Sequence, residues 1–318
     1  MKSGLILFNK KPGITSFDAL RDIKRSLGTG KVGHTGTLDK FAQGLLIVLV
    51  GRALRLSQWF TNCDKKYIGK IHFGIETDTL DPEGKTIHEA AVPTRQRVEE
   101  VLIQFTGDIL QAPPVYSAIH IDGKRASSMA RSGDIPEMKK RPVTVYKLEL
   151  LSWEPPFADI FVHCSSGTYI RSLARDIALA AGSRAHLCEL KRTQVGGFEL
   201  SHTETRRHGE HGEEGSLFLK PIDKSVISKL GISWFEIEEN EIEYIIHGKP
   251  LDFLLKSKIL NPSVSSVPPC VEPLGSKCVK SSLDPSESIA VFCDEKLIAI
   301  IEKIDKKWKY ACVFNQNS

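Results

Sequence analysis

The chain has 318 residues, of which 41% are hydrophobic and 26% charged, and its formal net charge is +4. This length fits one large or two unequal globular domains, and no apolar run is long enough for a transmembrane helix, which argues against a membrane protein. The N-terminus lacks the apolar stretch of a signal peptide, so we expect a cytoplasmic protein. The mild positive charge permits an anionic partner such as nucleic acid without requiring one.

The N-terminal part predicts a strand, a helix and a glycine-rich loop. Gly4 to Phe8 is a short apolar run, Pro12-Gly13 is a turn, and Ser16 suits the N-cap of an amphipathic helix. Four residues at helical spacing are expected to face inward in that helix: Phe17, Leu20, Ile23 and Leu27. The loop Gly33-His34-Thr35-Gly36-Thr37-Leu38-Asp39 follows, and Leu45 to Val50 is an apolar run too short to assign to a strand or a helix.

The middle of the chain alternates strand and helix patterns. Between Lys65 and Ile75 apolar residues recur at every second position, which predicts a half-buried strand with Tyr67 on its inner face. Residues 77–84 are typical of a turn. The remaining predictions are helices at 97–105 and 170–181, each ending near a glycine, and strands at 143–151 and 160–164.

The last third contains two stretches without a regular pattern. Residues 206–215 are rich in His, Gly and Glu but have no apolar anchor, so we interpret them as a solvated loop rather than a metal site. Residues 261–287 are rich in Ser and Pro and look like a mobile insertion. Strands predicted at 289–292, 297–301 and 310–314 form a small β-rich unit.

Three residues that lie far apart in the sequence are candidates for catalytic or substrate-binding roles. Asp39 is either a nucleophile or general base, or a carboxylate that caps a turn. Arg171 stands where an apolar strand meets a helix, so its guanidinium could pair with a carboxylate or a phosphate, although a surface arginine is the default. Tyr67 is either an aromatic platform for a nucleobase or a core aromatic, and the strand pattern favours the core.

Basic residues accompany aromatic and turn residues in three segments, at 113–118, 123–125 and 139–142. Such groups attract backbone phosphates, although most charged runs are simply solvated. The sequence contains no phosphate-binding P-loop, HExxH helix, GxSxG elbow or dinucleotide fingerprint. Its seven cysteines have no metal-like spacing, so neither a metal nor a disulfide framework is indicated.

Taken in order, these segments resemble the TruB family of tRNA pseudouridine synthases, which modify uridine 55 of the T loop. The resemblance extends over most of the chain and is carried by the following motifs: Asn9-Lys10-Lys11-Pro12-Gly13, Gly33 to Asp39 with Gly44-Leu45-Leu46, Lys66-Tyr67, Phe73-Gly74, Thr77 to Gly84, Pro113 to Ala118, Arg141 to Tyr146, Gly167 to Asp176, and Leu190 to Thr193. The sequence departs from the family at Lys40-Phe41, where Pro-Leu is common, and at Ser127, where a Tyr is common.

The resemblance implies an α+β (mixed α/β) fold with a central, largely antiparallel sheet flanked by helices. It also implies a catalytic domain over residues 1–235 and a small PUA-like RNA-binding module over 236–318. The module is matched by His247 to Leu251 and by Ala290-Val291-Phe292 onward, and the stretch at about 261–287 interrupts it.

The resemblance further implies that the protein flips a tRNA uridine out of the T stem-loop and isomerises it without a cofactor. Asp39 is then the essential carboxylate, expected as the nucleophile, with Arg171 as its ionic partner. Tyr67 is expected to stack on the target base and to assist removal of the proton from C5. His34 is expected to take the place of the flipped nucleotide. Three further substrate contacts match family positions: Tyr169, Leu190 and Lys10.

Two other readings stay open. A non-catalytic tRNA-binding or folding factor could use the same T-arm pocket, and relatives exist that need a guide RNA and partner proteins. The bacterial-looking motifs favour a protein that acts alone, as a monomer, without an obligatory guide RNA or protein partner.

Overall fold

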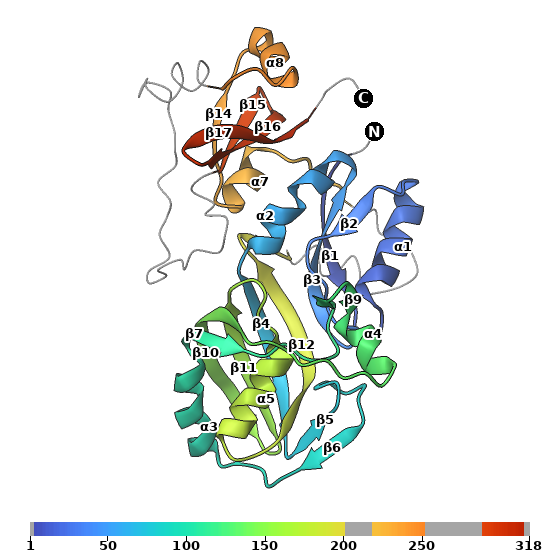
Figure 1. Cartoon of the computed structure of the whole chain (residues 1–318), viewed down its shortest axis with the longest axis vertical. Coiled ribbons are helices and arrows are strands. Elements are labelled where there is room, and N and C mark those ends of the chain that lie inside the picture. The colour runs from blue at the N-terminus through green and yellow to red at the C-terminus, as the bar shows by residue number, and fades with distance from the viewer. Residues whose placement is uncertain (1–2, 201–217, 252–287, 315–318) are drawn as a thin grey trace.

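The computed structural model describes residues 3–200, 218–251 and 288–314. Figure 1 shows a large sheet with helices at one end of the described chain and a smaller sheet at the other end. The expected mixed α+β fold, with a large sheet and a C-terminal β module, is confirmed. Among the described helices, none combines the length and apolar content that crossing a membrane requires.

Nine of the described strands form the larger sheet. Its main path is β1 (Gly4–Lys10), β3 (Gln43–Val50), β12 (Ala185–Val195), β4 (Lys65–Phe73), β11 (Phe157–Cys164), β10 (Arg141–Glu154) and β7 (Gly107–Gln111). Two short strands pair at its side, β2 (Val32–His34) with β3 and β13 (Phe198–Glu199) with β12. All neighbours are antiparallel except β3 and β12, which run parallel where Gln43 and Gly44 meet Lys191 and Arg192.

One apolar core joins this sheet to three helices, α1 (Ser16–Leu27), α3 (Arg95–Leu102) and α5 (Ile170–Ala180). Strand β4 shows how the sequence builds it, because its residues at every second position from Lys65 to Phe73 are buried. The shorter elements here are η1 (Gly51–Leu56), α2 (Ser57–Asn62), β5 (Ile75–Thr77), β6 (Thr86–Glu89), η2 (Ile103–Phe105), β8 (His120–Ile121), β9 (Lys124–Arg125) and α4 (Ala126–Arg131).

The structure corrects three details of the predicted elements. Thr15, not Ser16, caps α1, because its side chain accepts a hydrogen bond from Asp18 N. Phe17, expected to face inward, is 65% exposed, and the Arg21 guanidinium lies 5.8 Å from the centre of its ring. Ile75 belongs to β5 rather than to β4, because Gly74 bends the chain with a φ of +93°.

The smaller sheet has the order β14 (Ser233–Glu236), β15 (Ser288–Cys293), β16 (Lys296–Ile304) and β17 (Lys307–Val313), and its three predicted strands are confirmed. Helices α7 (Lys224–Lys229) and α8 (Glu239–Ile246) accompany it. The predicted boundary between residues 235 and 236 stays a prediction; it falls within β14. The stretches 206–215 and 261–287 lie outside the described residues.

Candidate active site

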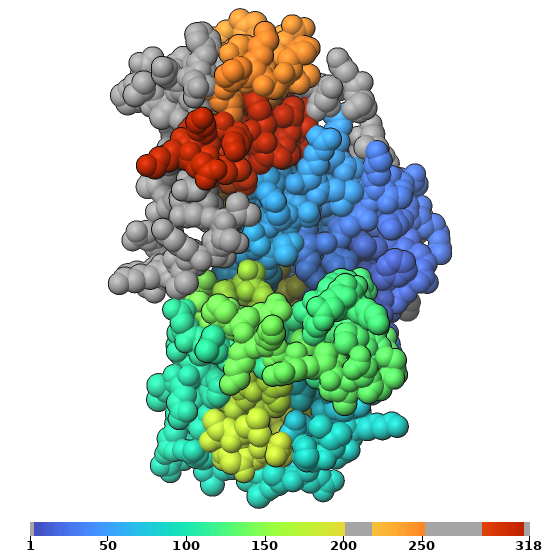
Figure 2. All heavy atoms as spheres, in the orientation of Figure 1, coloured from blue at the N-terminus to red at the C-terminus, as the bar shows by residue number. Residues whose placement is uncertain are grey.

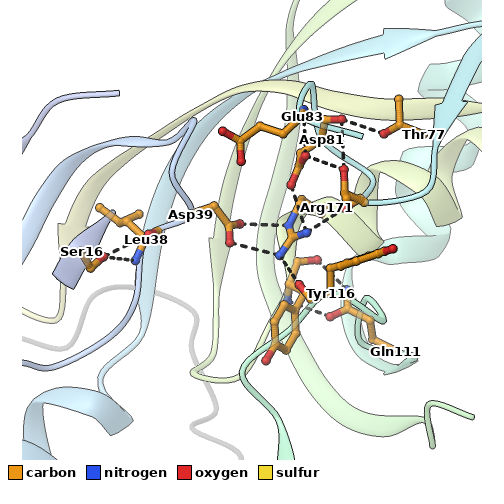
Figure 3. Close-up of polar contacts among 11 residues, drawn as sticks. Ser16, Leu38, Asp39, Thr77, Asp81, Glu83, Gln111, Tyr116 and Arg171 are labelled. Carbon is orange, nitrogen blue, oxygen red and sulfur yellow. Dashed lines mark hydrogen bonds and ion pairs between the residues drawn. The ribbon is translucent and has the colours of Figure 1, made fainter. Parts of the chain in front are cut away.

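Hydrogen bonds on both sides of Asp39 fix the backbone of the Gly33–Asp39 loop. Ser16 Oγ donates to Leu38 O and accepts from Leu38 N, both at 3.0 Å (Figure 3). On the other side of Asp39, Gly13 N donates to Lys40 O at 2.8 Å. The first turn of α1 and the Pro12-Gly13 turn therefore hold Asp39 in place, although both are distant from it in sequence.

Lys10 supports this loop from inside the protein. Its side chain has no exposed surface, and Nζ lies 2.7 to 3.3 Å from four backbone carbonyl oxygens, those of Lys11, Ile14, Lys40 and Ala42. Burial lowers the pKa of Lys10 to about 8, an effect that nearby Asp39 opposes. The resemblance implied a substrate contact for Lys10, but the structure gives its side chain no surface on which a substrate could lie.

Arg171 on α5 is the centre of the polar contacts around Asp39. Nη2 donates to Asp39 Oδ1 at 3.1 Å, and Nε lies 2.9 Å from Oδ2 as an ion pair without hydrogen-bond alignment. Nη1 donates to Asp81 Oδ2 at 3.2 Å and to Thr79 O at 2.7 Å, and Nη2 also donates to Tyr116 O at 3.0 Å. All four Nη hydrogens thus have acceptors, so the guanidinium is locked in one orientation (Figure 3).

Asp81 is a member of this site that sequence reasoning missed, because residues 77–84 were interpreted as a turn and as one of the family motifs, without a role for Asp81. It is 6% exposed, and its Oδ1 accepts from Thr79 Oγ1 at 2.6 Å and from Glu83 N at 3.1 Å. The preceding Leu80 has a φ of +60°, a strained conformation for a residue other than glycine. The available signal was a turn unusually dense in acidic residues.

Burial and two charged neighbours, Arg171 and Asp81, determine the pKa of Asp39. Burial raises its pKa above the ordinary value of 3.8, Arg171 opposes this effect, and the negative charge of Asp81 adds to it. The Asp39 side chain remains 35% exposed, whereas that of Asp81 is 9% exposed. Of the two acids that contact Arg171, Asp39 is therefore the one that another molecule can reach.

Tyr67 lies on the inner face of β4 and is 8% exposed. Burial raises the pKa of its hydroxyl to about 12, and a hydrogen bond and the positive charge of Arg192 oppose this shift. Arg192, another residue that sequence reasoning missed, is 3% exposed and donates to Leu45 O at 2.8 Å and to Gly36 O at 3.1 Å. It thereby links Tyr67 to the Gly33–Asp39 loop.

The other expected residues lie around this centre. Tyr169 precedes α5, and burial raises the pKa of its hydroxyl. The positive charge of Arg171 lowers this pKa, and the negative charge of Asp39 raises it. Leu190 on β12 is 6% exposed and shares the core with Tyr67. His34 ends β2, where burial and the charge of Arg192 lower its pKa, and its Nδ1 accepts weakly from Gly36 N at 3.4 Å. The structure pairs Asp39 directly with Arg171, and the charges of these two residues or of Arg192 act on Tyr67, Tyr169 and His34.

Within the described residues, no group of three or more His, Cys, Asp or Glu side chains is arranged to hold a metal ion. The arrangement offers instead an accessible, ionisable carboxylate, a locked guanidinium, and a tyrosine hydroxyl supported by a second arginine. Such a set can carry nucleophilic or acid–base chemistry on an uncharged ring and can stabilise a developing negative charge.

Comparison with known proteins shows which family the chain is similar to. Residues 24–170 match the family described as TruB family pseudouridylate synthase (N terminal domain). The tRNA pseudouridine synthase B of Borreliella burgdorferi (strain ZS7) is 42% identical over 77% of this chain and 91% of that protein. The enzyme of the same name from Stutzerimonas stutzeri (strain A1501) is 40% identical over 78% of this chain and 83% of its own.

Solved structures share the fold. A Cbf5-Nop10-Gar1 complex contains a chain with a TM-score of 0.66 and 23% identity, covering 98% of this chain and 84% of the other. A chain of an H/ACA RNP bound to a substrate RNA containing 2'-deoxyuridine has a TM-score of 0.64 and 22% identity. The match covers 99% of this chain and 86% of the other. From the family match and the two relatives of at least 40% identity, this chain belongs to the TruB family of pseudouridine synthases and is an enzyme.

Proposed function

We propose that this enzyme converts uridine to pseudouridine in tRNA, at position 55 of the T loop. The relatives that it matches over more than four fifths of their length are named tRNA pseudouridine synthase B, which supports tRNA as the substrate. The T-loop position rests on the ordered motifs of the sequence. The enzyme acts alone as a monomer in the cytoplasm and needs neither a guide RNA nor a cofactor.

The observation that carries this proposal is the partly exposed Asp39 held against Arg171, with the buried Asp81 on the other side of the guanidinium. In the reaction the N1–C1' bond of uridine breaks, the base turns, and a C5–C1' bond forms while C5 loses a proton and N1 gains one. No electrons are exchanged with another molecule, so no redox cofactor is needed. Asp39 attacks the base, attacks C1', or removes a ribose proton, and each route requires the ionised carboxylate.

The neighbouring residues have distinct roles in this proposal. Tyr67 stacks on the detached base and assists removal of the C5 proton, and the charge and hydrogen bond of Arg192 offset part of the burial that raises the pKa of its hydroxyl to about 12. Leu190 and Tyr169 complete the walls of the pocket. His34, with its lowered pKa, enters the RNA uncharged and fills the place of the flipped nucleotide, whose extrusion costs a few kcal/mol.

The basic segments 123–125 and 139–141 bind the phosphates of the T arm. Their lysines and arginines are all exposed. In Figure 2 the green chain that contains these segments lies below the blue N-terminal part that carries Asp39. Binding through phosphates makes the affinity fall as the salt concentration rises.

A tritium-release assay tests the proposal. The protein is incubated with a tRNA transcript that carries tritium at C5 of every uridine, and with a second transcript in which cytidine replaces uridine 55. We expect release of one tritium per molecule from the first transcript and none from the second. Equal release from both transcripts would reject the T-loop position, and no release from either, with tight RNA binding, would favour the folding factor instead.

A further inference from the structure

Helix α5, which carries Arg171, begins without a cap of its own. Tyr169 occupies the N-cap position, but its side chain makes no capping hydrogen bond. The first backbone N–H groups of a helix have no partner within the helix, so an uncapped first turn frays easily. Arg171 lies in that first turn, where fraying would move its guanidinium away from Asp39.

Gln111 binds the backbone of the residue at this N-cap position. It ends β7, is 1% exposed, and uses both ends of its amide on one residue: Oε1 accepts from Tyr169 N at 2.8 Å, and Nε2 donates to Tyr169 O at 3.1 Å. Tyr169 O also accepts from Leu173 N at 3.0 Å, the first hydrogen bond of the helix. Two hydrogen bonds to one peptide backbone fix orientation as well as distance, and burial removes competition from water.

The residues after Gln111 contact the same helix at two further points. Ala112 O accepts from Arg175 Nη2 at 3.2 Å, and Tyr116 O accepts from Arg171 Nη2 at 3.0 Å. Between them lie the buried Pro113 and Pro114, whose rings restrict the backbone. Segment 111–116 therefore holds both the start of α5 and the tip of the Arg171 side chain, as Figure 3 shows for Gln111 and Tyr116.

We propose that Gln111 is a positioning residue for the isomerisation, which sets Arg171 against Asp39 by clamping the backbone of Tyr169. The proposal rests on the function proposed above for the Asp39 site. Gln111 itself is buried behind Tyr169 and does not touch the substrate. Misplacement of a catalytic group by about 1 Å can cost about 100-fold in rate, so loss of the clamp should slow chemistry rather than weaken RNA binding.

The first test replaces Gln111 by Met, which has a similar length and removes both hydrogen bonds. We expect the single-turnover rate of tritium release at saturating RNA to fall about 100-fold, while the Kd for the T-arm RNA changes less than about twofold. Gln104→Met is the matched control, because Gln104 is exposed on the neighbouring η2, and its rate should equal that of the wild type. Thermal unfolding establishes that each variant is folded at the assay temperature.

A second variant, Gln111→Glu, keeps the acceptor for Tyr169 N but places a carboxylate oxygen against Tyr169 O. A buried carboxyl group beside a carbonyl oxygen has a raised pKa, and its protonated form regains a donor. The ratio of the variant rate to the wild-type rate should therefore rise as pH falls from about 8 to about 5. This pH-dependent recovery also decides the question if the Met variant does not fold, because a residue with a purely structural role would give a constant ratio.

Two results would overturn the inference: a wild-type rate in a folded Gln111 variant, or a loss that lies entirely in Kd. The Asp39→Ala protein, assayed in parallel, keeps this outcome separate from a failure of the proposed function. If Asp39→Ala releases tritium as the wild type does, the proposed function fails. If Asp39→Ala is inactive while both Gln111 variants are fully active, only the role of Gln111 is rejected.

Discussion

Arg171 is the residue on which the geometry of the site depends most. It is 5% exposed, and its guanidinium contacts two carboxylates and two backbone carbonyls that come from three separate segments. A lysine could not replace it, because an ammonium group has three hydrogens and no planar fork. The same contacts that orient Asp39 also neutralise part of the buried charge of Asp81.

Replacing Arg171 by Met should therefore destabilise the protein as well as inactivate it. Asp81 would be left buried without its ionic partner, and breaking a buried pair in this way costs about 3–5 kcal/mol. Arg25→Met is the matched control, because Arg25 and Asp22 are both more than 75% exposed and such pairs contribute about 0–1 kcal/mol. Urea denaturation measures the free energy of unfolding of each variant. Equal losses of this free energy in Arg171→Met and Arg25→Met would contradict the expected difference.

The raised pKa of Asp39 predicts that the reaction rate falls at acidic pH. The ionised carboxylate is the reactive form, so the single-turnover rate should rise with pH through a midpoint above 3.8, the ordinary aspartate value. Because the charge of Asp81 contributes to this shift, Asp81→Asn should move the midpoint to lower pH while also lowering the maximal rate through a looser Arg171. An unchanged or higher midpoint in this variant would argue against the coupling.

The same shift has a consequence for stability. A carboxyl whose pKa is higher in the folded than in the unfolded state favours folding in its protonated form, and this contribution is lost as pH rises through the folded pKa. Ionised Asp39 therefore costs stability at neutral pH. Asp39→Asn should have a higher Tm relative to the wild type at pH 7 than at pH 4, and differential scanning calorimetry at both pH values measures it. A difference in Tm independent of pH would contradict the raised pKa.

Single residues of the site could be predicted only in part from the sequence. Asp39 and Arg171 were singled out as residue types in suggestive places, and the family resemblance joined them. Asp81, Arg192 and Gln111 were missed, because their importance lies in contacts with residues far along the chain. Phe17 was placed wrongly, because helical periodicity shows which residues share a face but not where the covering neighbour ends.

At the scale of elements, the parallel pairing of β3 with β12 brings the Gly33–Asp39 loop to the rest of the candidate site. Gly44 makes this pairing possible: it has a φ of +102°, and a Cβ atom added there would lie 2.3 Å from Arg192 O. The close approach of the two backbones places Arg192 beside Gly36 and Tyr67.

Gly44→Ala should consequently lower the free energy of unfolding by more than the cost of placing alanine at this positive φ. Gly107 provides the control, because its φ is +93° but nothing lies within 4 Å of an added Cβ. Gly107→Ala should cost about 1–2 kcal/mol through its left-handed conformation, and Gly44→Ala should cost more, because β12 must move. Denaturant titration compares the two, and an equal or smaller loss at Gly44 would refute the close approach.

The elements themselves were largely predictable, whereas their arrangement was not. Alternating or continuous apolar runs located β1, β4, β15 and β16, and helical spacing located α5. The order of strands in the sheet and the parallel contact of β3 with β12 depend on pairings between distant segments, which periodicity does not contain. Only the family resemblance pointed to a central, largely antiparallel sheet.

At the scale of the whole molecule, the two sheets share a core. Residues of β1, β3 and α2 pack in one apolar cluster with Ala290, Phe292 and Ile300 of the smaller sheet. Polar contacts cross the same boundary, from Trp59 Nε1 to Ser288 Oγ at 3.3 Å and from Arg55 to the carbonyl of Val313. Figure 2 shows the red C-terminal strands directly against the blue N-terminal part.

This shared core predicts that the two sheets unfold together. Phe292 is fully buried in it, so Phe292→Ala should lower the free energy of unfolding by about 3–5 kcal/mol in a single transition. Phe17→Ala, at an exposed phenylalanine, should leave stability within about 0.5 kcal/mol of the wild type. Calorimetry that resolved two transitions in the Phe292→Ala protein would show that the smaller sheet unfolds independently.

The central claim is that Asp39 carries the isomerisation. The most direct measurement compares tritium release from a T-arm RNA labelled at C5 of the target uridine by the wild type and by Asp39→Ala, at RNA concentrations that saturate both. We expect complete release by the wild type, no detectable release by the variant, and the same Kd for RNA in both. Undiminished release by a folded Asp39→Ala protein would contradict the claim.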